Sequence, residues 1–447
     1  MEKLLDQVVK KKNMEKALET LNPAACAGID GISIEQLKTR FPDMYEDLKE
    51  RIIAGKYKPI KLLRIYIPKN DTEYRMLSIP AAVDRMIQAS IVSVLAPIYE
   101  TDFSDYSFGF IEGRGCFPAI IYTLREINKG KHHIIKIDLR KFFDSVPHDI
   151  LMQVLKKKIK DEDLLKLIQK YLVVKAVVPR KGTVAVTKGV PQGGPLSPLL
   201  SNIFLNELDT YLQSQHITFS RYADDCMILC NSEWEANCQY EKVVDYIEHV
   251  LKLEINYGKT KICDASDIDF LGYTFKKTEF GYVLDVPEKK IEYLRNRMQE
   301  VIREYYEKVS NKEFVGKLME ITRGWVNYYS LANIEKKLSE LDRWFEETIT
   351  EIHKYDRDVY LAECRKLMRV GMRKREAYII ANTDRKMEGK TVMQLKIPVE
   401  KYYTWILKAG YIPCADLLRN IWRERGKRHE KKKKKDSSGK STVVPAQ

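Results

Sequence analysis

The sequence lacks any run of 18 apolar residues, so it predicts no membrane-spanning helix. Residues 1–21 are charged throughout and lack the apolar core of a secretory signal peptide. None of the eight cysteines forms a Cys-x-x-Cys pair, and the seven histidines are dispersed, so no zinc-binding pattern is present. We therefore expect reduced thiols, a cytoplasmic location and no membrane partner.

The composition is that of a globular protein with a surplus of positive charge. Its 447 residues are 44% hydrophobic and 31% charged, which is enough chain for roughly three domains. Lys and Arg number 77 against 63 Asp and Glu, a net charge of +14, which favours a polyanionic partner such as nucleic acid. Residues 423–435 hold nine Lys or Arg and two Glu, half of that surplus, and we expect disorder from Gly426 onward.

Hydrophobic spacing predicts mixed α and β structure up to residue 286 and helices after it. Expected helices in the first part cover residues 1–21, 34–54, 82–99, 148–172, 197–214 and 238–252. Expected strands cover residues 63–67, 134–139 and 270–275, and a hairpin is expected over residues 173–190. The later helices are expected at residues 288–308, 312–330 and 333–354, followed by a helical region over 357–422.

Two adjacent carboxylates, Asp224 and Asp225, lie between two segments that can each form a strand. A third acid, Asp138, ends a buried strand 86 residues before Asp224. An Asp-Asp pair also occurs in ordinary solvated turns, so the pair alone leaves that interpretation open. If the strands are neighbours in one sheet, the three acids can hold two Mg²⁺, or Mn²⁺, about 3.5–4 Å apart, which suits in-line phosphoryl transfer.

Three blocks, at residues 138–144, 189–198 and 221–225, resemble the palm motifs of reverse transcriptases and occur in the same order. Further blocks resemble bacterial group II intron-encoded reverse transcriptases, at residues 67–69, 75–80, 84–88, 107–110, 113–115, 257–261 and 270–273. Residues 28–31 resemble the N-terminal extension loop of that family, and residues 323–329 resemble the signature of its thumb, the maturase domain. The resemblance extends from residue 20 to about residue 420.

The resemblance implies an α/β plus all-α chain with the right-hand polymerase fold. Fingers and palm would be mixed α/β with an antiparallel palm sheet, and the thumb, or maturase domain, would be helical. The domains expected are the N-terminal extension and fingers at 1–135, the palm with fingers segments at 136–286, the thumb at 287–355, a helical nucleic-acid-binding region at 356–425 and a basic disordered tail at 426–447.

The resemblance also implies a role for each matched residue. Asp138, Asp224 and Asp225 would be catalytic, and with the Leu139 carbonyl they would be the metal ligands. Lys69 and Arg75 would bind the triphosphate of the incoming nucleotide, because fixed positive charge stabilises charge that builds up on phosphates. The nucleotide pocket would also include Leu139, Phe143 and Gln192. Phe143 would exclude a ribose 2′-hydroxyl and so select deoxynucleotides, and Leu271-Gly272 would form the primer grip.

The function implied is an RNA-directed DNA polymerase of a group II intron, which binds intron RNA, assists splicing and copies the intron into DNA for retrohoming. Its partners would be the intron RNA or another structured RNA template, a DNA target and primer, and dNTPs. It would act in the bacterial cytoplasm and associate with the nucleoid when it acts on DNA. The sequence does not indicate the oligomeric state.

Two alternatives stay open at this stage. One is a domesticated group II-like reverse transcriptase that serves phage defence, spacer acquisition or DNA repair, and the other is a splicing maturase that binds RNA without polymerising. The family's Trp/Lys-rich motif after the thumb is absent, since residues 353–358 read His-Lys-Tyr-Asp-Arg-Asp. No His/Cys-rich nuclease motif follows either, so we expect a form without the C-terminal endonuclease domain.

Overall fold

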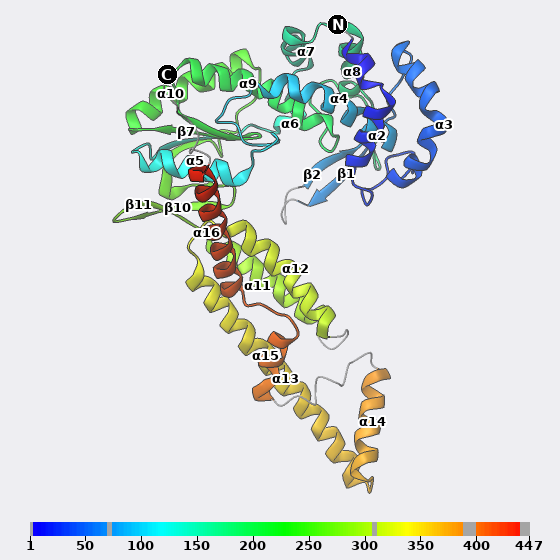
Figure 1. Cartoon of the computed structure of the whole chain (residues 1–447), viewed down its shortest axis with the longest axis vertical. Coiled ribbons are helices and arrows are strands. Elements are labelled where there is room, and N and C mark those ends of the chain that lie inside the picture. The colour runs from blue at the N-terminus through cyan, green and yellow to red at the C-terminus, as the bar shows by residue number, and fades with distance from the viewer. Residues whose placement is uncertain (1–2, 69–73, 306–310, 388–398, 439–447) are drawn as a thin grey trace, which may run out of the picture. The chain divides into compact units, whose positions relative to one another are not determined.

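The computed structural model describes residues 3–68, 74–305, 311–387 and 399–438, so Lys69 lies outside the described residues. The chain divides into two compact units, Met1–Asp267 and Ile268–Gln447 (Figure 1). In the described ranges, no helix has the length and apolar character needed to cross a membrane.

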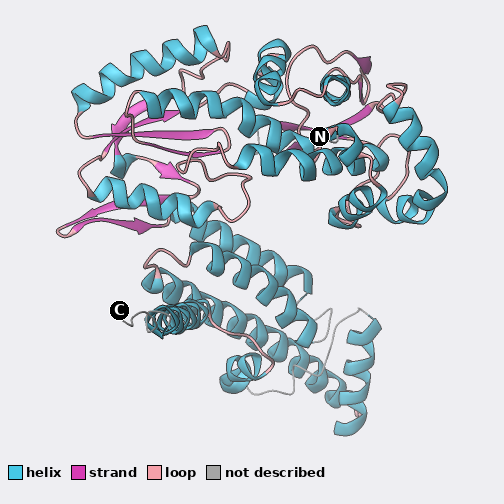
Figure 2. Cartoon of the chain, turned by 45° about the horizontal axis from the view of Figure 1, so that its top comes forward, coloured by secondary structure: helices cyan, strands magenta, loops and turns pink. Residues whose placement is uncertain are grey.

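The first unit combines two sheets with many helices (Figure 2). Its helices are α1 (Leu4–Val8), α2 (Lys11–Thr20), α3 (Ile34–Ile53), α4 (Ala82–Glu100), α5 (Cys116–Asn128), α6 (Phe142–Ser145), α7 (His148–Lys158), α8 (Glu162–Leu172), α9 (Leu196–Ser214) and α10 (Glu233–Asp245), with a π-helix at Tyr246–Val250 and a 3₁₀-helix at Ala265–Asp267. Its strands are β1 (Leu62–Pro68), β2 (Tyr74–Ile79), β3 (His133–Ile137), β4 (Ala176–Val178), β5 (Gly182–Val184), β6 (Phe219–Tyr222), β7 (Asp225–Cys230) and β8 (Lys261–Asp264).

A four-stranded antiparallel sheet with the order β6-β7-β3-β8 forms the centre of this unit. The Ile134, Ile135 and Ile137 side chains of β3 are buried, and α5 and α10 pack against the sheet. Because β3 and β7 are antiparallel and pair Ile137 with Cys226, the end of β3 lies beside the start of β7. The predicted neighbour relation of these strands is confirmed, and it brings Asp138 to the β6–β7 turn.

The second sheet of this unit has the order β2-β1-β4-β5. β1 pairs with β2 in antiparallel register, with Ile67 opposite Arg75, and it pairs with β4 in parallel register. The β4–β5 hairpin confirms the turn predicted near Lys181-Gly182. One large hydrophobic core runs through the helices and the central sheet, and a smaller one lies under β1 and β4.

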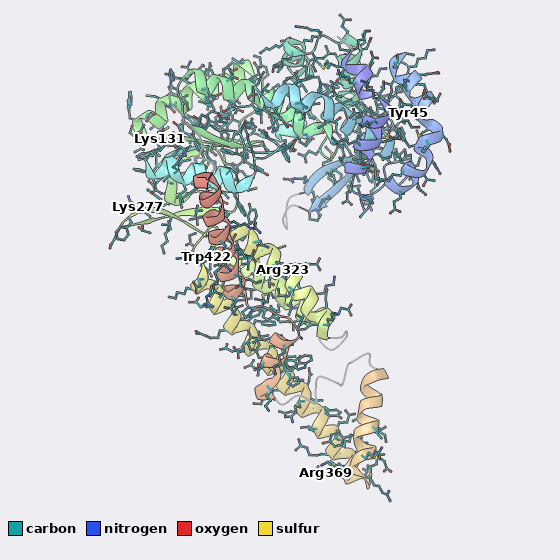
Figure 3. The ribbon with its side chains drawn as sticks, in the orientation of Figure 1. Tyr45, Lys131, Lys277, Arg323, Arg369 and Trp422 are labelled. Atoms are coloured by element: carbon teal, nitrogen blue, oxygen red, sulfur yellow. The ribbon has the colours of Figure 1, made fainter. Side chains whose placement is uncertain are left out.

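The second unit is a small sheet followed by long helices. The sheet has the order β11-β10-β9, with β9 at Asp269–Phe270, β10 at Tyr273–Thr278 and β11 at Gly281–Asp285. The helices are α11 (Glu288–Tyr305), α12 (Asn311–Tyr329), α13 (Glu335–Arg369), α14 (Lys374–Met387), α15 (Val399–Lys408) and α16 (Cys414–Ser438). The indole N–H of Trp422, labelled in Figure 3, donates to the Ser330 carbonyl at 2.8 Å and joins α16 to the end of α12.

The structure differs from the sequence prediction in several elements. Residues 1–21 form two helices, α1 and α2, and α13 runs without a break through the interval expected between residues 354 and 357. Residues 148–172 form two helices, because the Asp161 carboxylate caps α8 by accepting from the backbone N–H groups of residues 163 and 164. Residues 270–275 contain a tight turn at Leu271-Gly272 between β9 and β10, and they are not one strand. α16 continues to Ser438 through the basic run expected to be disordered, which agrees with the high helix propensity of Lys, Arg and Glu.

The boundary between the two units also lies earlier than the palm–thumb boundary predicted at residues 286 and 287. The sheet β9–β11 belongs to the helical unit, because its residues pack and bond with the helices that follow. Tyr273 packs against Tyr328 and Tyr329 of α12, and Lys337 of α13 forms an ion pair with Asp285 at 3.0 Å.

Candidate active site

Asp224 lies at the tip of the hairpin between β6 and β7. Tyr222 pairs with Asp225, so the turn consists of Ala223 and Asp224 alone. Ala223 has a left-handed φ of 55°, a conformation that costs a residue other than glycine roughly 1–2 kcal/mol. Such strain persists only where the surroundings hold the backbone in place, and it is typical of functional sites.

Asp138 follows β3 and is held by the segment that precedes β8. Asn256 Nδ2 donates to Asp138 Oδ1 at 2.9 Å, and the backbone N–H of Asn256 donates to the Asp138 carbonyl at 2.9 Å. The Asp138 backbone N–H donates to the Thr260 hydroxyl at 3.0 Å. These bonds fix both the backbone and the carboxylate of Asp138.

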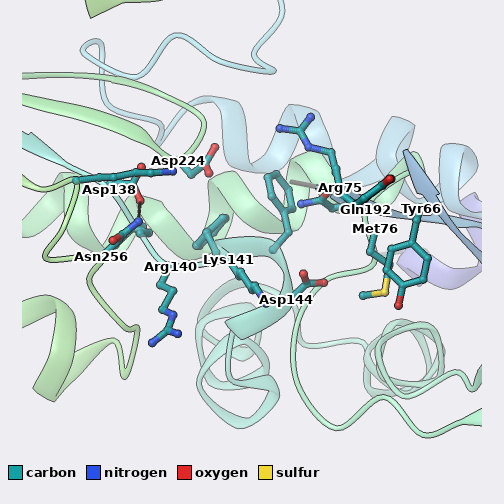
Figure 4. A pocket seen from close by; sticks show the side chains of 15 residues that line it. Tyr66, Arg75, Met76, Asp138, Arg140, Lys141, Asp144, Gln192, Asp224 and Asn256 are labelled. Carbon is teal, nitrogen blue, oxygen red and sulfur yellow. Dashed lines mark hydrogen bonds between the residues drawn. The ribbon is translucent and has the colours of Figure 1, made fainter. Parts of the chain in front are cut away.

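Asp138 and Asp224 line one cavity of about 580 Å³, and Figure 4 shows the two carboxylates beside each other. Four more residues singled out from the sequence line the same cavity, namely Arg75, Leu139, Phe143 and Gln192. Asp225 lines a neighbouring cavity of about 670 Å³, in which Asp224 also takes part. Asp224 thus lies at the border between the two cavities.

A cluster of three carboxylates, as expected from the sequence, is not formed. In the part of the chain that the structure describes, no three Asp, Glu, His or Cys side chains are grouped so that they could hold a metal ion. Asp224 belongs to the turn and Asp225 to the paired strand, and only Asp224 reaches the cavity that Asp138 lines.

The donor atoms around the first cavity nevertheless fit a hard divalent cation. Leu139 and Ile255 form an isolated antiparallel bridge, in which the bonds run from Arg140 N–H to the Glu254 carbonyl and from Asn256 N–H to the Asp138 carbonyl. In this pattern the N–H and C=O of Leu139 point away from the partner segment. Two carboxylates and one backbone carbonyl are oxygen ligands of the kind that Mg²⁺ and Mn²⁺ prefer.

Gln192 is fixed against strand β2 by its backbone. The Ser78 N–H donates to the Gln192 carbonyl at 2.7 Å. Gly193 follows with a φ of 114°, and a Cβ placed on it would lie 2.4 Å from the Ser78 carbonyl oxygen. Glycine is therefore required for the loop to approach β2 so closely, and this approach sets the position of Gln192 in the cavity.

Phe143 lies on the short helix α6, beyond the end of strand β3. β3 ends at Ile137, and Phe142–Ser145 forms a short helix. Successive residues of a helix point in different directions, so the side chains of Phe142 and Phe143 diverge. Phe142 is only 1% exposed and belongs to the core, while Phe143 lines both cavities. The Val190 N–H donates to the Phe143 carbonyl at 2.6 Å and holds it beside the Gln192 loop.

The cavity also contains residues to which sequence reasoning assigned no role. They are Tyr66, Tyr74, Met76, Arg140, Lys141, Phe142, Asp144, Asn256 and Lys259. Burial raises the pKa of Asp144, although the charges of Arg64 and Lys141 oppose that shift. Lys141, Phe142 and Asp144 lie inside the first palm-like block, so the sequence could have placed them at the site. Asn256 is an uncharged residue outside the matched blocks, and nothing in the sequence indicates its role.

The proposed primer grip, Leu271-Gly272, forms a two-residue turn in the second unit. Both residues have positive φ, 50° and 81°, as the tight hairpin turns between antiparallel strands require. The Tyr328 hydroxyl donates to the Leu271 carbonyl at 2.7 Å, and the Tyr273 hydroxyl donates to the Tyr328 carbonyl. The turn is thus held by the end of α12, the helix that carries the maturase-like signature.

Comparison with known protein families finds two matches along the chain. Residues 67–275 match the family described as reverse transcriptase (RNA-dependent DNA polymerase). Residues 291–359 match the family described as group II intron, maturase-specific domain. The first range contains Asp138, Asp224 and Asp225, and the second contains most of α11, α12 and α13.

Several curated proteins are similar to this chain. Protein YkfC of Escherichia coli K12 is 31% identical over 59% of this chain and 80% of its own length. The group II intron-encoded protein LtrA of Lactococcus lactis is 37% identical over 43% of this chain, but over only 31% of its own length. The retron Ec83 reverse transcriptase of Escherichia coli is 25% identical over 52% of this chain and 70% of its own length.

A solved structure described as a partial Cas6-RT-Cas1–Cas2 complex is also similar. It is 24% identical, with a TM-score of 0.36, over 56% of this chain and 43% of that chain.

Proposed function

The chain belongs to the reverse transcriptases, the RNA-directed DNA polymerases, with a group II intron maturase-specific domain, and on this premise we propose that it serves a group II intron. It binds the intron RNA, assists its splicing and copies it into DNA for retrohoming. The observation that carries this proposal is the maturase-specific match at residues 291–359, directly after the polymerase match in the same chain.

Family membership implies catalysis with divalent metal ions and binding of RNA and DNA. In this proposal, Asp138, Asp224 and the Leu139 carbonyl hold the ions, with Asp225 as a further ligand or support, and Mg²⁺ is the natural ion with Mn²⁺ as a substitute. When bound, two such ions would lower the pKa of an attacking 3′-hydroxyl and would stabilise the leaving pyrophosphate. Asn256 holds the Asp138 carboxylate in one orientation through the hydrogen bond of 2.9 Å to Oδ1.

The remaining cavity residues select and place the nucleotide. Arg75, on β2, presents a guanidinium that can bind phosphate oxygens in pairs. Lys69, which lies outside the described residues, is proposed to add a second cation. Phe143 lines this cavity and would exclude a ribose 2′-hydroxyl, so the proposed substrates are dNTPs. Gln192 lines the same cavity and would contact the nucleotide, and Leu271-Gly272 would support the primer strand.

Primer extension on an RNA template tests the polymerase proposal. With Mg²⁺ and dNTPs the wild type should extend the primer, with rNTPs it should extend poorly, and Asp224→Ala should reduce extension by at least about 10³-fold while RNA binding is kept. Equal inactivity of wild type and Asp224→Ala, with splicing of an intron RNA still promoted by both, would favour the non-polymerising maturase.

A domesticated reverse transcriptase is a second candidate. It is favoured by the similarity to the retron Ec83 reverse transcriptase, because the matched region covers 70% of that enzyme's length. Sequencing of the RNA that co-purifies with the full chain separates the two proposals. A folded group II intron that contains the reading frame supports the first, and a short structured RNA from a stand-alone locus supports the second.

A further inference from the structure

Arg221 is a fully buried charged residue next to the β6–β7 turn. It lies on β6 with none of its side chain exposed, and Asp209 of α9 is equally buried. The Arg221 Nε donates to Asp209 Oδ1 at 2.7 Å and its Nη2 donates to Asp209 Oδ2. Burial by itself would lower the pKa of Arg221, but the Asp209 carboxylate outweighs burial and raises it.

The third nitrogen of this guanidinium reaches the turn itself. Arg221 Nη1 donates to the Ala223 carbonyl at 2.9 Å and to Asn202 Oδ1 at 3.1 Å. Ala223 is the residue with the left-handed φ of 55°, and it directly precedes Asp224. One planar group therefore joins helix α9 to the strained peptide that carries the catalytic carboxylate.

The segment 106–109 holds the same turn from another side. Asn202 Nδ2 donates to the Gly109 carbonyl at 2.7 Å, and the Phe108 N–H donates to the Arg221 carbonyl at 2.9 Å. A Cβ on Gly109 would lie 2.5 Å from the Ala223 nitrogen, so this backbone is in direct contact with the turn. Ala223 thus keeps an unfavourable conformation because groups on two sides fix it.

We propose that Arg221, fixed by Asp209 and Asn202, is a positioning residue that holds the Ala223–Asp224 turn and thereby sets the affinity of the Asp138–Asp224 pair for divalent cations. Arg221 touches neither cavity, so it acts through the turn and not on the substrate. The inference deepens the proposed polymerase function and rests on it for the role of the cation, but binding of the cation is measurable without polymerisation.

The test uses Arg221→Lys in the full chain. Lysine keeps the charge beside Asp209 but lacks the planar fork, so it cannot bond Asp209 and the Ala223 carbonyl together. Titration of Mn²⁺, followed by the electron paramagnetic resonance of the free ion on a complex with a dideoxy-terminated primer, should show an affinity reduced by about 10-fold. The Mg²⁺ concentration for half-maximal extension should rise by a similar factor, with extension largely restored at saturating Mg²⁺.

Tyr57→Phe is the matched control. It removes another buried hydrogen bond of the same unit, the bond of 2.7 Å that the Tyr57 hydroxyl donates to Asp84 Oδ1. Tyr57 lines neither of the two cavities. It should lower the melting temperature and leave the Mn²⁺ affinity unchanged. If Arg221→Lys also lowers only the melting temperature, with the same Mn²⁺ affinity as wild type, Arg221 is merely structural and the proposal is overturned.

The double variant Arg221→Lys, Ala223→Gly tests the role of the turn. Glycine adopts positive φ without penalty, so the turn needs less support and most of the lost Mn²⁺ affinity should return; no recovery would overturn the proposal. If Arg221→Lys does not fold, Asn202→Ala should weaken Mn²⁺ binding in the same direction, and an unchanged affinity would again overturn it. Wild type that binds Mn²⁺ through Asp138 and Asp224 but extends no primer refutes the polymerase function while leaving this inference standing.

Discussion

At the scale of single residues, the site depends on side chains that orient the carboxylates as much as on the carboxylates themselves. Asp138 is bonded on both backbone and side chain by Asn256, and Asp224 follows a strained alanine. Asn256 carries no charge, so its contribution to the site comes from geometry.

Asn256→Ala should reduce the rate of primer extension by about 10-fold, since residues that orient a metal ligand typically matter to that degree. The loss follows from removal of the bond at 2.9 Å, which leaves the Asp138 carboxylate free to rotate. Steady-state kinetics at saturating dNTP measures it. Asn237→Ala is the control, because the exposed Asn237 amide only bonds the Glu233 carbonyl on α10; equal rates for the two variants would contradict a role for Asn256.

At the scale of elements, the packing of helix α4 against the segment that precedes β1 depends on a buried carboxylate. Asp84 Oδ1 accepts from the Tyr57 hydroxyl at 2.7 Å, and Oδ2 accepts from the Ile60 N–H at 2.9 Å. Burial raises the pKa of Asp84 from 3.8 to about 6, while these hydrogen bonds lower it. The folded state therefore binds a proton more tightly than the unfolded state does.

The sign of this shift predicts how stability depends on pH. Between about pH 4 and pH 6 the folded chain keeps the Asp84 proton that the unfolded chain has lost, so the free energy of unfolding falls by about 3 kcal/mol as pH rises. The side chain of Asp84→Asn cannot titrate, so the variant should lack this loss of stability. Its free energy of unfolding relative to wild type should therefore rise by about 3 kcal/mol between about pH 4 and pH 6. Urea denaturation at pH 4, 5, 6 and 7 measures the difference, and parallel curves for variant and wild type would count against it. The Tyr57 hydroxyl lowers the pKa of Asp84, so Tyr57→Phe should raise that pKa further and should steepen the fall of the free energy of unfolding with pH.

The turn between β9 and β10 gives a second prediction at this scale. Gly272 has a φ of 81°, and a Cβ on it would lie 2.9 Å from the Tyr329 hydroxyl, so Gly272→Ala should destabilise the second unit by about 1–2 kcal/mol. Gly324→Ala is the matched change in the same unit, since Gly324 is inside α12 with nothing within 4 Å, and it should stabilise by about 0.5–1 kcal/mol. Hydrogen exchange of the α12 amides measures the stability of the second unit in both variants. A change of the same sign in the two variants would refute this account of the turn.

At the scale of the whole molecule, each compact unit contributes a different part of the proposed function. The first unit contains the cavity with Asp138 and Asp224, and the second contains the Leu271-Gly272 turn and the maturase-specific match. Basic side chains occur on both units, including Lys131 in the first and Lys277 and Arg369 in the second (Figure 3). The net charge of +14 is thus not confined to the C-terminal basic run.

RNA affinity should therefore depend steeply on salt. If the basic surfaces neutralise six or more phosphates, the affinity for RNA should fall by about 10³-fold between roughly 50 and 200 mM salt, because counterions are released on binding. Filter binding across that range measures the slope. Replacement of Lys431 to Lys435 by Gln should reduce the slope only in part; a flat response of the wild type would show that phosphate contacts do not drive binding.

The sequence by itself determined the family and the chemistry. The three palm blocks, the acids Asp138 and Asp224, and the change from mixed structure to long helices were all readable in it, because residue type and periodicity are properties of the chain alone. The strands on either side of Asp224 were predictable for the same reason, since buried strands need continuous apolar segments.

Only the tertiary structure decided which distant groups meet. Asp225 pairs with Tyr222 on the β6–β7 hairpin and lines only the neighbouring cavity, whereas Asp138 and Asp224 line the same one, and the segment before β8 supplies Asn256. Leu271-Gly272, expected within a strand, forms a turn that the Tyr328 hydroxyl of α12 holds. Arg221, paired with the buried Asp209, holds Ala223. Such contacts depend on which segments far apart in the chain meet and in what register, and the period of hydrophobic residues carries no information about either.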